Sequence, residues 1–311
     1  MWSEDYRPRE FCDVMGHESV IQNLITVLKY GNKNIQNMLL LGASSVGKTT
    51  ILKCIIKEYY DDTHFDSVLM LNASDDRGIN TMRTKIKTFV STKSYNKHRK
   101  LVIFDDIENM STDTQFALRR IIESYADNAR FIMTTSVLNR IIPSLYSRCI
   151  ILRLHSMTPR NIKPLLIKHS LEYVANDPIL FEEITDLLKC DIRRILTFLQ
   201  LYSYKSSISK DDLYHFVFNI SYADYSTLQN HLLSNEKDPR VFLDFFTSIQ
   251  INVSQILHIC FHALNNLKSN INRISLLSEV EDKYTTVNHI GSKMFIYEIC
   301  LILALDSSFK S

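Results

Sequence analysis

The chain has 311 residues, of which 45% are hydrophobic and 23% are charged, with a formal net charge of +2. These values are typical of an ordinary globular protein with room for two or three domains. Six scattered cysteines without a C-x-x-C pair exclude a disulfide framework and a paired-cysteine zinc site. The longest apolar run, Met294–Leu305, contains Glu298 and is too short to span a membrane, and the polar first residues indicate no signal peptide.

The first half of the chain alternates between two kinds of hydrophobic pattern. After a probable helix near Val20–Tyr30, short apolar runs predict strands, and amphipathic segments between them predict helices. The strands are expected at 38–41, 67–72, 101–105 and 130–135, and the helices at 48–60, about 79–91 and about 111–125. This alternation predicts an α/β fold, a parallel sheet with helices on both faces that binds ligands at the carboxyl ends of its strands.

A glycine-containing loop joins the first expected strand to the helix that follows it. Its sequence fits the phosphate-binding pattern G-x-x-x-x-G-K-[ST] without a mismatch: Gly42, Ala43, Ser44, Ser45, Val46, Gly47, Lys48 and Thr49, followed by Thr50. Backbone N–H groups of such a loop point at phosphate oxygens, and the helix N-terminus adds partial positive charge. Lys48 is expected to reach the β- and γ-phosphates, and the Thr49 hydroxyl to contact Mg²⁺.

Two carboxylates end the expected strand at 101–105. In phosphate-loop ATPases such a strand supplies the acidic residue that holds Mg²⁺, usually through water, and Asp105 is the candidate for that role. The next residue, Asp106, stands where many ATPases use a glutamate to polarise the attacking water. Because its side chain is one methylene shorter, the sequence predicts nucleotide binding more securely than hydrolysis.

Basic residues concentrate between Arg77 and Phe104. This window has eight lysines and arginines and no acidic residue, so it carries +8 while the rest of the chain sums to −6. Such a local field is typical of a polyanion contact, although a solvated lysine-rich helix and loop would give the same pattern.

Strand signals fade after Arg153, and the rest of the chain is expected to be helical. We predict a core at 1–155, a helical region at 156–220 and an all-helical region at 221–311. A helical stripe that indicates either a core or packing between subunits is formed by Val253, Ile256, Leu257, Cys260, Leu264 and Leu267.

Several motifs together resemble the small subunits of replication factor C, the AAA+ clamp loader of eukaryotes and archaea. The segment 71–89 contains the Asn-Ala-Ser-Asp-Asp-Arg-Gly-Ile box of that family. Four further matches follow the family's order: the N-terminal box at 4–8 and 13–16, the central helix at 115–123, Ser-Arg-Cys at 147–149 and the lid motif at 190–194. The resemblance covers residues 4–200 closely and the remainder only as an all-helical collar.

The resemblance implies a role for each matching position. Further nucleotide-binding residues would be Tyr6, Arg7, Val14, Met15, Ser136 and Arg193. The candidate catalytic residues would be Asp106, in this chain's own site, and Arg148, an arginine finger that reaches into the nucleotide site of a neighbouring subunit. DNA phosphates would be contacted by Arg77, Arg83, Lys87 and Arg119, without sequence specificity.

The resemblance also implies cofactors, partners and a location. The cofactors would be ATP and Mg²⁺, and the partners four other replication factor C subunits, a ring-shaped sliding clamp and primer–template DNA, with no membrane. The protein would act in the nucleus, in DNA replication and repair.

The chain departs from the family pattern around one phosphate. The family's usual loop, Gly-Pro-Pro-Gly-Thr-Gly-Lys-Thr, has different middle residues here, and its Asp-Glu-Ala-Asp box is Asp105-Asp106-Ile107-Glu108. Ser136 replaces an asparagine that senses the γ-phosphate, and Cys190 replaces a glycine. These changes favour a subunit that binds ATP tightly and hydrolyses it slowly.

Three functions fit these observations. The first is an ATP-driven clamp-loader subunit, and the second is a structural subunit that binds ATP and donates Arg148 but hydrolyses little or nothing. The third, an unrelated phosphate-loop enzyme such as a small-molecule kinase, is disfavoured by the basic window and the Ser-Arg-Cys motif.

Overall fold

The computed structural model divides the chain into two compact units, Met1–Gln200 and Leu201–Ser311. It describes residues 1–30, 35–60, 67–72, 79–92, 99–169, 171, 174, 176–205, 207–234, 238–249, 251–266, 271–286 and 292–304. The three-part division expected from the sequence, with boundaries near 155 and 220, stays a prediction.

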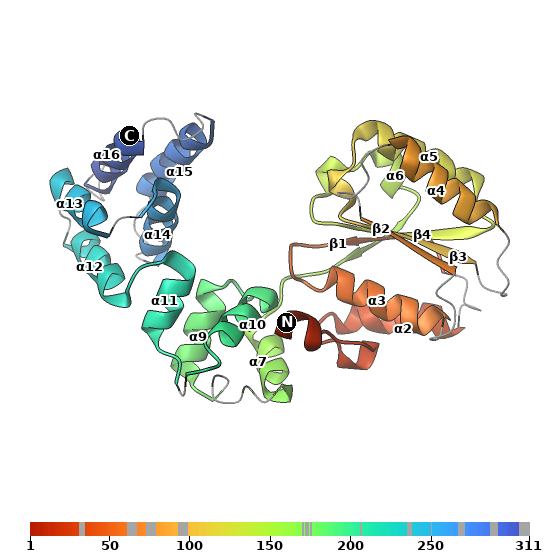
Figure 1. Ribbon diagram of the computed structural model, residues 1–311, viewed down its shortest axis with the longest axis horizontal. Coiled ribbons are helices and arrows are strands. Elements are labelled where there is room, and N and C mark those ends of the chain that lie inside the picture. The colour runs from red at the N-terminus through yellow and green to blue at the C-terminus, as the bar shows by residue number, and fades with distance from the viewer. Residues whose placement is uncertain are drawn as a thin grey trace. The chain divides into compact units, whose positions relative to one another are not determined.

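Unit 1 begins with an N-terminal segment and continues as alternating strands and helices (Figure 1). Its elements are α1 (Trp2–Asp5), η1 (Phe11–Asp13), α2 (Glu18–Tyr30), β1 (Met38–Leu41), α3 (Lys48–Tyr60), β2 (Val68–Asn72), α4 (Ile79–Ser91), β3 (Lys100–Asp105), η4 (Ile107–Asn109), α5 (Thr112–Ser124), β4 (Ala129–Thr135), η5 (Leu138–Arg140), α6 (Pro143–Tyr146), β5 (Ile150–Arg153), α7 (Pro159–Lys168), α9 (Pro178–Leu187) and α10 (Ile192–Leu201).

The five described strands form one parallel sheet in the order β2-β3-β4-β1-β5. The register pairs Leu41 of β1 with Thr135 of β4, and Phe104 of β3 with Met133 of β4. The carboxyl ends of β1, β3 and β4 therefore meet at the same edge. In this order β4 lies between the strand that leads into the phosphate loop and the strand that ends in Asp105.

Two separate hydrophobic cores cover the two faces of this sheet, with α2 and α3 on one face and α4, α5 and α6 on the other (Figure 1). Side chains that alternate along β4 divide between the cores, so that Ile132 belongs to the first and Phe131 and Met133 to the second. Both faces of the strands are buried, which is why they read as continuous apolar runs in the sequence.

Helices α7, α9 and α10 complete unit 1, and local signals start two of them. Asp177 accepts hydrogen bonds from the backbone N–H groups of Ile179 and Leu180 and caps α9. The Asp191 carboxylate does the same at the start of α10, for the N–H groups of Arg193 and Arg194.

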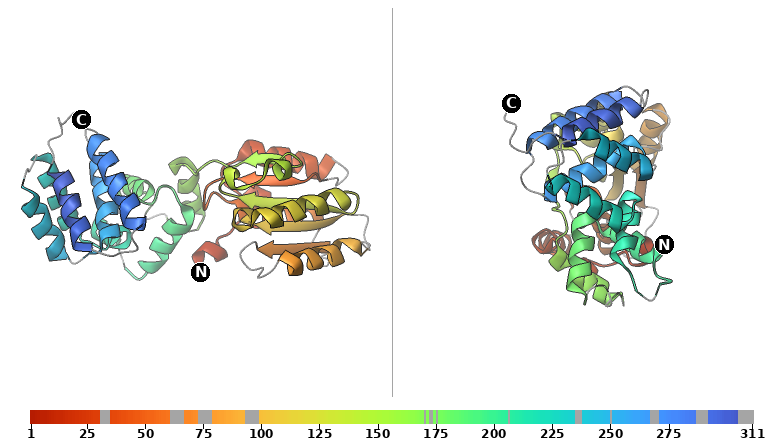
Figure 2. Two further views of the ribbon diagram at one scale, coloured as in Figure 1. Left: turned by 90° about the horizontal axis from the view of Figure 1, so that it is seen from above. Right: turned by 90° about the vertical axis from the view of Figure 1, so that its left-hand side faces the viewer.

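Unit 2 is helical in all its described elements: α11 (Lys210–Phe218), α12 (Tyr222–Leu233), α13 (Pro239–Ile249), α14 (Val253–Asn266), α15 (Ile271–Thr286) and α16 (Ser292–Leu303). Helix α16 packs against α13, α14 and α15, as the two views of Figure 2 also show. Buried Phe218 and Tyr225 stack between α11 and α12, and the Tyr225 hydroxyl lies 2.7 Å from Nδ1 of His262 on α14. The expected stripe is buried from Val253 to Leu264, and Leu267 lies outside the described residues.

The expected fold class is confirmed: a parallel sheet with helices on both faces precedes a helical region. All four predicted strands are present within one residue of their expected ends. Strand β5 is not among the predicted strands, because four residues at a sheet edge with half-exposed side chains give a weak pattern. None of the helices in the described ranges is long and apolar enough to cross a bilayer.

Candidate nucleotide-binding site

The loop after β1 has the backbone geometry of a phosphate-binding loop. Gly47 has a φ of +100°, a conformation that residues with a side chain rarely adopt. At Gly42 an added Cβ would lie only 2.7 Å from the Leu154 carbonyl oxygen. Ser45 has a φ of +60°, although it carries a side chain. The loop leads directly into α3, so the first N–H groups of that helix face the same space.

The Lys48 side chain folds back over the loop. Its Nζ donates hydrogen bonds to the carbonyl oxygens of Gly42 (2.8 Å) and Ala43 (3.0 Å). The residue is only 8% exposed, yet it lines the pocket above the loop. A third N–H of the ammonium group remains to donate to an anion in that pocket.

Thr49, in the first turn of α3, and Asp105, at the end of β3, meet at the edge of the sheet, although β4 lies between β3 and the strand that leads into the phosphate loop. The Thr49 hydroxyl donates a hydrogen bond to Asp105 Oδ2 at 3.1 Å. The second oxygen, Oδ1, accepts one from the Thr134 hydroxyl at 2.5 Å. A hydroxyl and a carboxylate are the hard oxygen ligands that Mg²⁺ prefers. Among the described residues no cluster of three or more His, Cys, Asp or Glu side chains could hold a metal.

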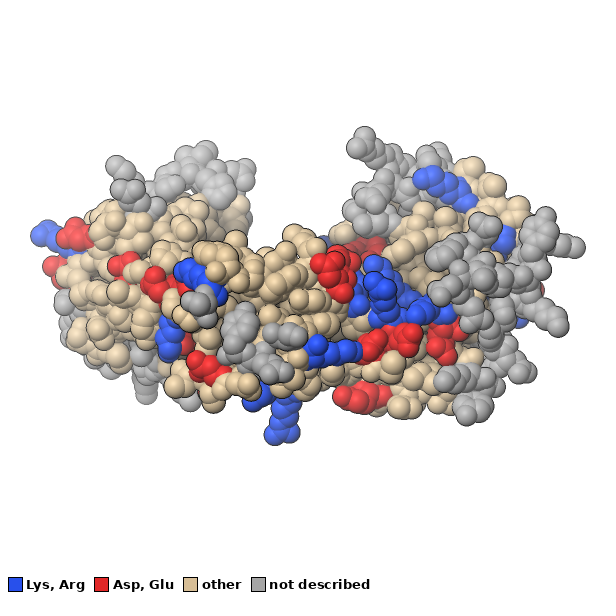
Figure 3. Space-filling model, turned by 60° about the horizontal axis from the view of Figure 1, so that its bottom comes forward, with Lys and Arg blue, Asp and Glu red and all other residues tan. Residues whose placement is uncertain are grey.

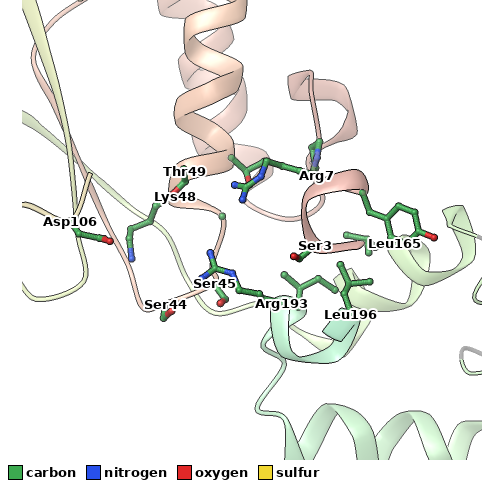
Figure 4. A pocket seen from close by; sticks show the side chains of 15 residues that line it. Ser3, Arg7, Ser44, Ser45, Lys48, Thr49, Asp106, Leu165, Arg193 and Leu196 are labelled. Carbon is green, nitrogen blue, oxygen red and sulfur yellow. The ribbon is translucent and has the colours of Figure 1, made fainter. Parts of the chain in front are cut away.

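Asp106 lines the pocket, has a left-handed backbone conformation and carries a carboxyl group with a raised pKa. Its φ of 53° and ψ of 54° are left-handed, and its N–H donates to the Thr134 hydroxyl at 2.9 Å. Burial, followed by the negative charges of Asp105 and Glu108, raises the pKa of the Asp106 carboxyl above its ordinary value. In Figure 4 its side chain points toward Lys48.

The pocket has a polar end and an apolar end. Figure 4 shows Lys48 and Asp106 at one end, Leu165 and Leu196 at the other, and Arg7 and Arg193 between them. Its lining is Ser3, Tyr6, Arg7, Pro8, Ser44, Ser45, Gly47, Lys48, Thr49, Thr50, Asp106, Leu165, Ile192, Arg193 and Leu196. The N-terminal segment, the phosphate loop, α7 and α10 therefore all contribute to one site.

The N-terminal segment is held in this place by contacts on both sides. Arg7 donates to the Thr50 hydroxyl at 3.3 Å and pairs with Glu4, and its hydrogen bond to that carboxylate lowers the pKa of Glu4. The Tyr6 ring stacks on His169 at the end of α7, with 4.1 Å between the ring centroids. Two further ion pairs, Lys57–Glu10 and Lys168–Asp13, join the segment to α3 and α7. Figure 3 shows basic and acidic side chains next to one another on one face of the molecule.

Several predicted nucleotide-binding residues lie near the pocket without lining it. Val14 and Met15 are half-buried before α2, and Val14 packs against the first core. The Val46 carbonyl faces His17, whose Nε2 lies 3.0 Å away. Gly42 and Ala43 contribute carbonyl oxygens to Lys48.

Ser136 bonds to Glu108 and does not line the pocket. Its N–H donates to Glu108 Oε1 at 3.0 Å, and its hydroxyl donates to the same oxygen. Burial raises the pKa of Glu108, but these hydrogen bonds outweigh it and hold that pKa below its ordinary value. Because Ser136 does not line the pocket, the geometry gives no support to its predicted contact with the γ-phosphate.

Arg148 is exposed and does not line the pocket of its own chain. Its guanidinium lies 2.5 Å from both the Ser144 carbonyl oxygen and Glu123 Oε1. The same Glu123 oxygen accepts a hydrogen bond from Arg119 at 3.1 Å. The candidate finger and a candidate DNA contact thus share one carboxylate. The neighbouring Cys149 is half-buried, and this loss of hydration raises the pKa of its thiol to about 12.

The basic window is only partly described. Lys87 is exposed on α4, whereas Arg77 and the side chain of Arg83 lie outside the described residues. Lys100, which counts toward the charge of the window, is buried: its Nζ donates to the Phe89 carbonyl oxygen at 2.6 Å and to the Thr92 hydroxyl.

Sequence reasoning missed several residues of the site. His17 contacts the phosphate loop, and Thr134 contacts the Asp105 carboxylate. The other missed residues line the pocket: Ser3, Pro8, Leu165, Ile192 and Leu196. Thr134 gave a weak signal, a polar residue in an otherwise apolar strand. The apolar lining residues could not be distinguished from core residues by their spacing.

Comparison with known proteins agrees with this geometry. Residues 34–162 match the family model described as AAA domain. The chain is 38% identical over 207 residues to replication factor C small subunit 1 of Pyrobaculum islandicum, covering 64% of this chain and 61% of that protein. It is 38% identical over 206 residues to replication factor C subunit 5 of Homo sapiens, covering 64% and 59%. The small subunit of Sulfolobus acidocaldarius is 32% identical over 216 residues, covering 69% and 66%.

These matches span about three fifths to two thirds of the length of the relatives. Among solved structures, a variant of RuvB from Thermotoga maritima has a TM-score of 0.53 at 18% identity and covers 80% of this chain and 88% of its own. That likeness concerns the fold alone. At 32–38% identity over about two thirds of its length, the chain is similar to replication factor C small subunits, and its residues 34–162 match an AAA domain.

Proposed function

We propose that this chain is an ATP-binding subunit of a pentameric DNA clamp loader. With four other replication factor C subunits, it would open a ring-shaped sliding clamp and place it on primer–template DNA, in the nucleus, during replication and repair. The observation that carries the proposal is the hydrogen bond from Thr49 to Asp105, which joins the phosphate loop to the acidic strand across β4. It is the arrangement that nucleoside triphosphate and Mg²⁺ need together.

The two ends of the pocket suit the two ends of ATP. Lys48 and the loop N–H groups would bind the phosphates at the polar end, and Arg193 would reach them from the middle of the pocket. The adenine would occupy the apolar end beside Leu165 and Leu196. Thr49 and Asp105 would hold Mg²⁺, which when bound neutralises phosphate charge.

Hydrolysis would depend on Asp106. Its carboxylate must accept a hydrogen bond from water to orient it, and its raised pKa shows that the ionised form is less favoured in this setting. A second candidate function, a structural subunit that binds ATP and hydrolyses little, is favoured by one observation: both donors of Ser136 are engaged by Glu108.

Two substitutions separate these functions in an assembled loader. Lys48→Ala should abolish clamp loading if the chain is a motor and reduce it only slightly if the chain is structural. Asp106→Glu should raise ATP turnover if the short carboxylate limits hydrolysis. Unchanged turnover would show that the aspartate is not limiting.

Assembly and DNA contacts would use the exposed groups outside the pocket. On α16, Met294, Tyr297 and Leu301 are 71%, 49% and 44% exposed at helical spacing, which suits a subunit contact. Lys87 and Arg119, together with Arg77 and Arg83, would follow DNA phosphates without reading the bases.

The experiment that tests the proposal is affinity purification of this chain from the cells that produce it, followed by intact-mass analysis. Four other phosphate-loop chains at equal stoichiometry, with a ring clamp when ATP is present, are the expected result. A monomer or a simple homo-oligomer would contradict the clamp-loader assignment. The Lys48→Ala chain is the control for clamp retention that requires ATP.

A further inference from the structure

Thr134 contacts both acidic residues of the candidate site. Its hydroxyl oxygen lies 2.5 Å from Asp105 Oδ1 and 2.9 Å from the backbone nitrogen of Asp106. It belongs to β4, the strand between β3, which ends in Asp105, and β1, which leads into the phosphate loop. The strand order thus places this one hydroxyl between the Asp105 carboxylate and the backbone of Asp106.

The surroundings of the Thr134 hydroxyl fix the direction of its proton. The Asp106 N–H can only donate, so the hydroxyl oxygen accepts there. An ionised carboxylate can only accept, so the hydroxyl proton points at Asp105 Oδ1. Since Thr49 donates to Oδ2, the Asp105 carboxylate is held by one hydroxyl on each oxygen, from two different elements. Its rotation about the side-chain bond is therefore restricted.

Packing alone does not explain a threonine at this position. Thr134 is fully buried, and valine would fill the same space in a strand without a hydroxyl that needs a partner. The next residue, Thr135, is also fully buried, but its hydroxyl bonds to the backbone of Val137, at 3.2 and 3.3 Å, and to the Glu108 carboxylate. Of these two adjacent buried threonines, Thr134 is the one whose hydroxyl bonds to the Asp105 carboxylate and to the Asp106 N–H.

We propose that Thr134 is a positioning residue for the metal and the water-orienting carboxylate of this site. Through Asp105 it sets the orientation of the carboxylate that would hold Mg²⁺. Through the Asp106 N–H it holds the left-handed turn on which that second carboxylate stands. The inference rests on the proposed function, because it assumes that the pocket binds nucleotide with Mg²⁺. Loss of a partner behind a metal ligand typically lowers metal affinity by about 10–100-fold.

The test measures binding of a fluorescent ATP analogue to the full chain, with Mg²⁺ and with EDTA. For Thr134→Val, the affinity in EDTA should stay within about twofold of the wild type, while the Mg²⁺ concentration needed to tighten binding should rise about 10–100-fold. Thr134→Ser retains the hydroxyl and should restore the wild-type response. Thr135→Val is the matched control and should leave the Mg²⁺ response unchanged.

Other results would overturn the inference in distinguishable ways. A Thr134→Val chain with the wild-type Mg²⁺ response would overturn it alone, as would a loss of affinity equal in Mg²⁺ and in EDTA. If Thr134→Val does not fold, as judged by its thermal transition, Thr134→Ala takes its place with the same expectation. A Thr134→Ser chain as impaired as the valine variant would show that the hydroxyl is not responsible. A wild-type chain that binds no nucleotide would overturn the proposed function itself.

Discussion

At the scale of single residues, the chain places side chains where its backbone favours glycine. Ser45 in the phosphate loop and Cys190 before α10 have φ values of 60° and 53°, in the left-handed region. Both stand where replication factor C subunits usually have glycine. Asp106 has a φ of 53°, and aspartate tolerates this conformation better than the longer glutamate. The short carboxylate of the site is therefore consistent with its backbone.

Glycine at either of the first two positions should stabilise the protein. We expect Ser45→Gly and Cys190→Gly each to raise the free energy of unfolding by about 0.5–1 kcal/mol, because relief of the left-handed strain exceeds the entropic cost of glycine. Urea denaturation of the purified chain measures this. Ser44→Gly is the control, because Ser44 is exposed in the same loop and has no positive φ. This variant should lower the free energy of unfolding. Equal effects at 44 and 45 would contradict the argument.

The pair of Ser136 and Glu108 should make stability depend on pH. Its hydrogen bonds lower the folded-state pKa of Glu108 below the ordinary 4.5, so their contribution is present above that pH and is lost as the pH falls through the lowered pKa. We expect Ser136→Ala to cost about 1 kcal/mol at pH 7, and the difference from wild type to shrink below pH 4.5. Denaturation curves across this range measure it. Ser124→Ala removes a hydroxyl bonded to a helix carbonyl and should show no such pH dependence.

At the scale of elements, α4 and β3 show that not every lysine of the basic window is available at the surface to bind a ligand. Lys100 lies at the start of β3 and donates to the last turn of α4, where its ammonium group also sits 4.7 Å from the centre of the Phe89 ring. Burial lowers the pKa of this lysine. Its charge stabilises the carbonyl end of a helix, while Lys87 on the same helix is exposed.

The two lysines should therefore respond differently to substitution. In the assembled loader, Lys87→Ala should weaken DNA binding and reduce the slope of log affinity against log salt by about 0.9. Lys100→Met should leave that slope unchanged and lower the free energy of unfolding by about 1–3 kcal/mol, because two acceptors lose a charged donor. Salt titrations of DNA binding and urea denaturation measure the two effects. A changed slope for Lys100→Met would show that its charge does reach DNA.

At the scale of the whole molecule, the proposed division of roles between subunits depends on where Arg148 lies. It is exposed outside the pocket of its own chain and is held by Glu123 and the Ser144 carbonyl oxygen. Exposed ion pairs contribute little to stability, so this contact can exchange for a phosphate of another subunit at small cost.

The prediction for Arg148→Ala follows from this placement. ATP turnover at the adjoining subunit should fall by about 10³-fold or more, whereas nucleotide affinity of this chain should not change. Single-turnover hydrolysis by the assembled loader and nucleotide titration of the isolated chain measure the two quantities. Arg119→Ala, which removes the other arginine on Glu123, is the control. Weaker nucleotide binding by the isolated Arg148→Ala chain would place the residue in its own site.

Much of the α/β architecture could be predicted because its signals are local. Strands buried on both faces appear as apolar runs, and the phosphate loop has a fixed spacing that only a strand–loop–helix unit satisfies. Strand β5 could not be predicted, since it is short and its side chains are not fully buried. The buried state of Lys100 had no local signal either, because it depends on contact with the end of α4.

By itself the sequence determined the order of strands and helices, the phosphate loop, the acidic strand end and the resemblance to replication factor C small subunits, because each depends on residues close together in the chain. Only the tertiary structure decided which strand lies between Asp105 and the phosphate loop, and so which hydroxyl contacts both the Asp105 carboxylate and the Asp106 N–H. It also decided that Ser136 faces Glu108 and that Arg148 lies outside its own pocket. Those contacts join residues far apart in the sequence, and the strand order that creates them leaves no pattern in it.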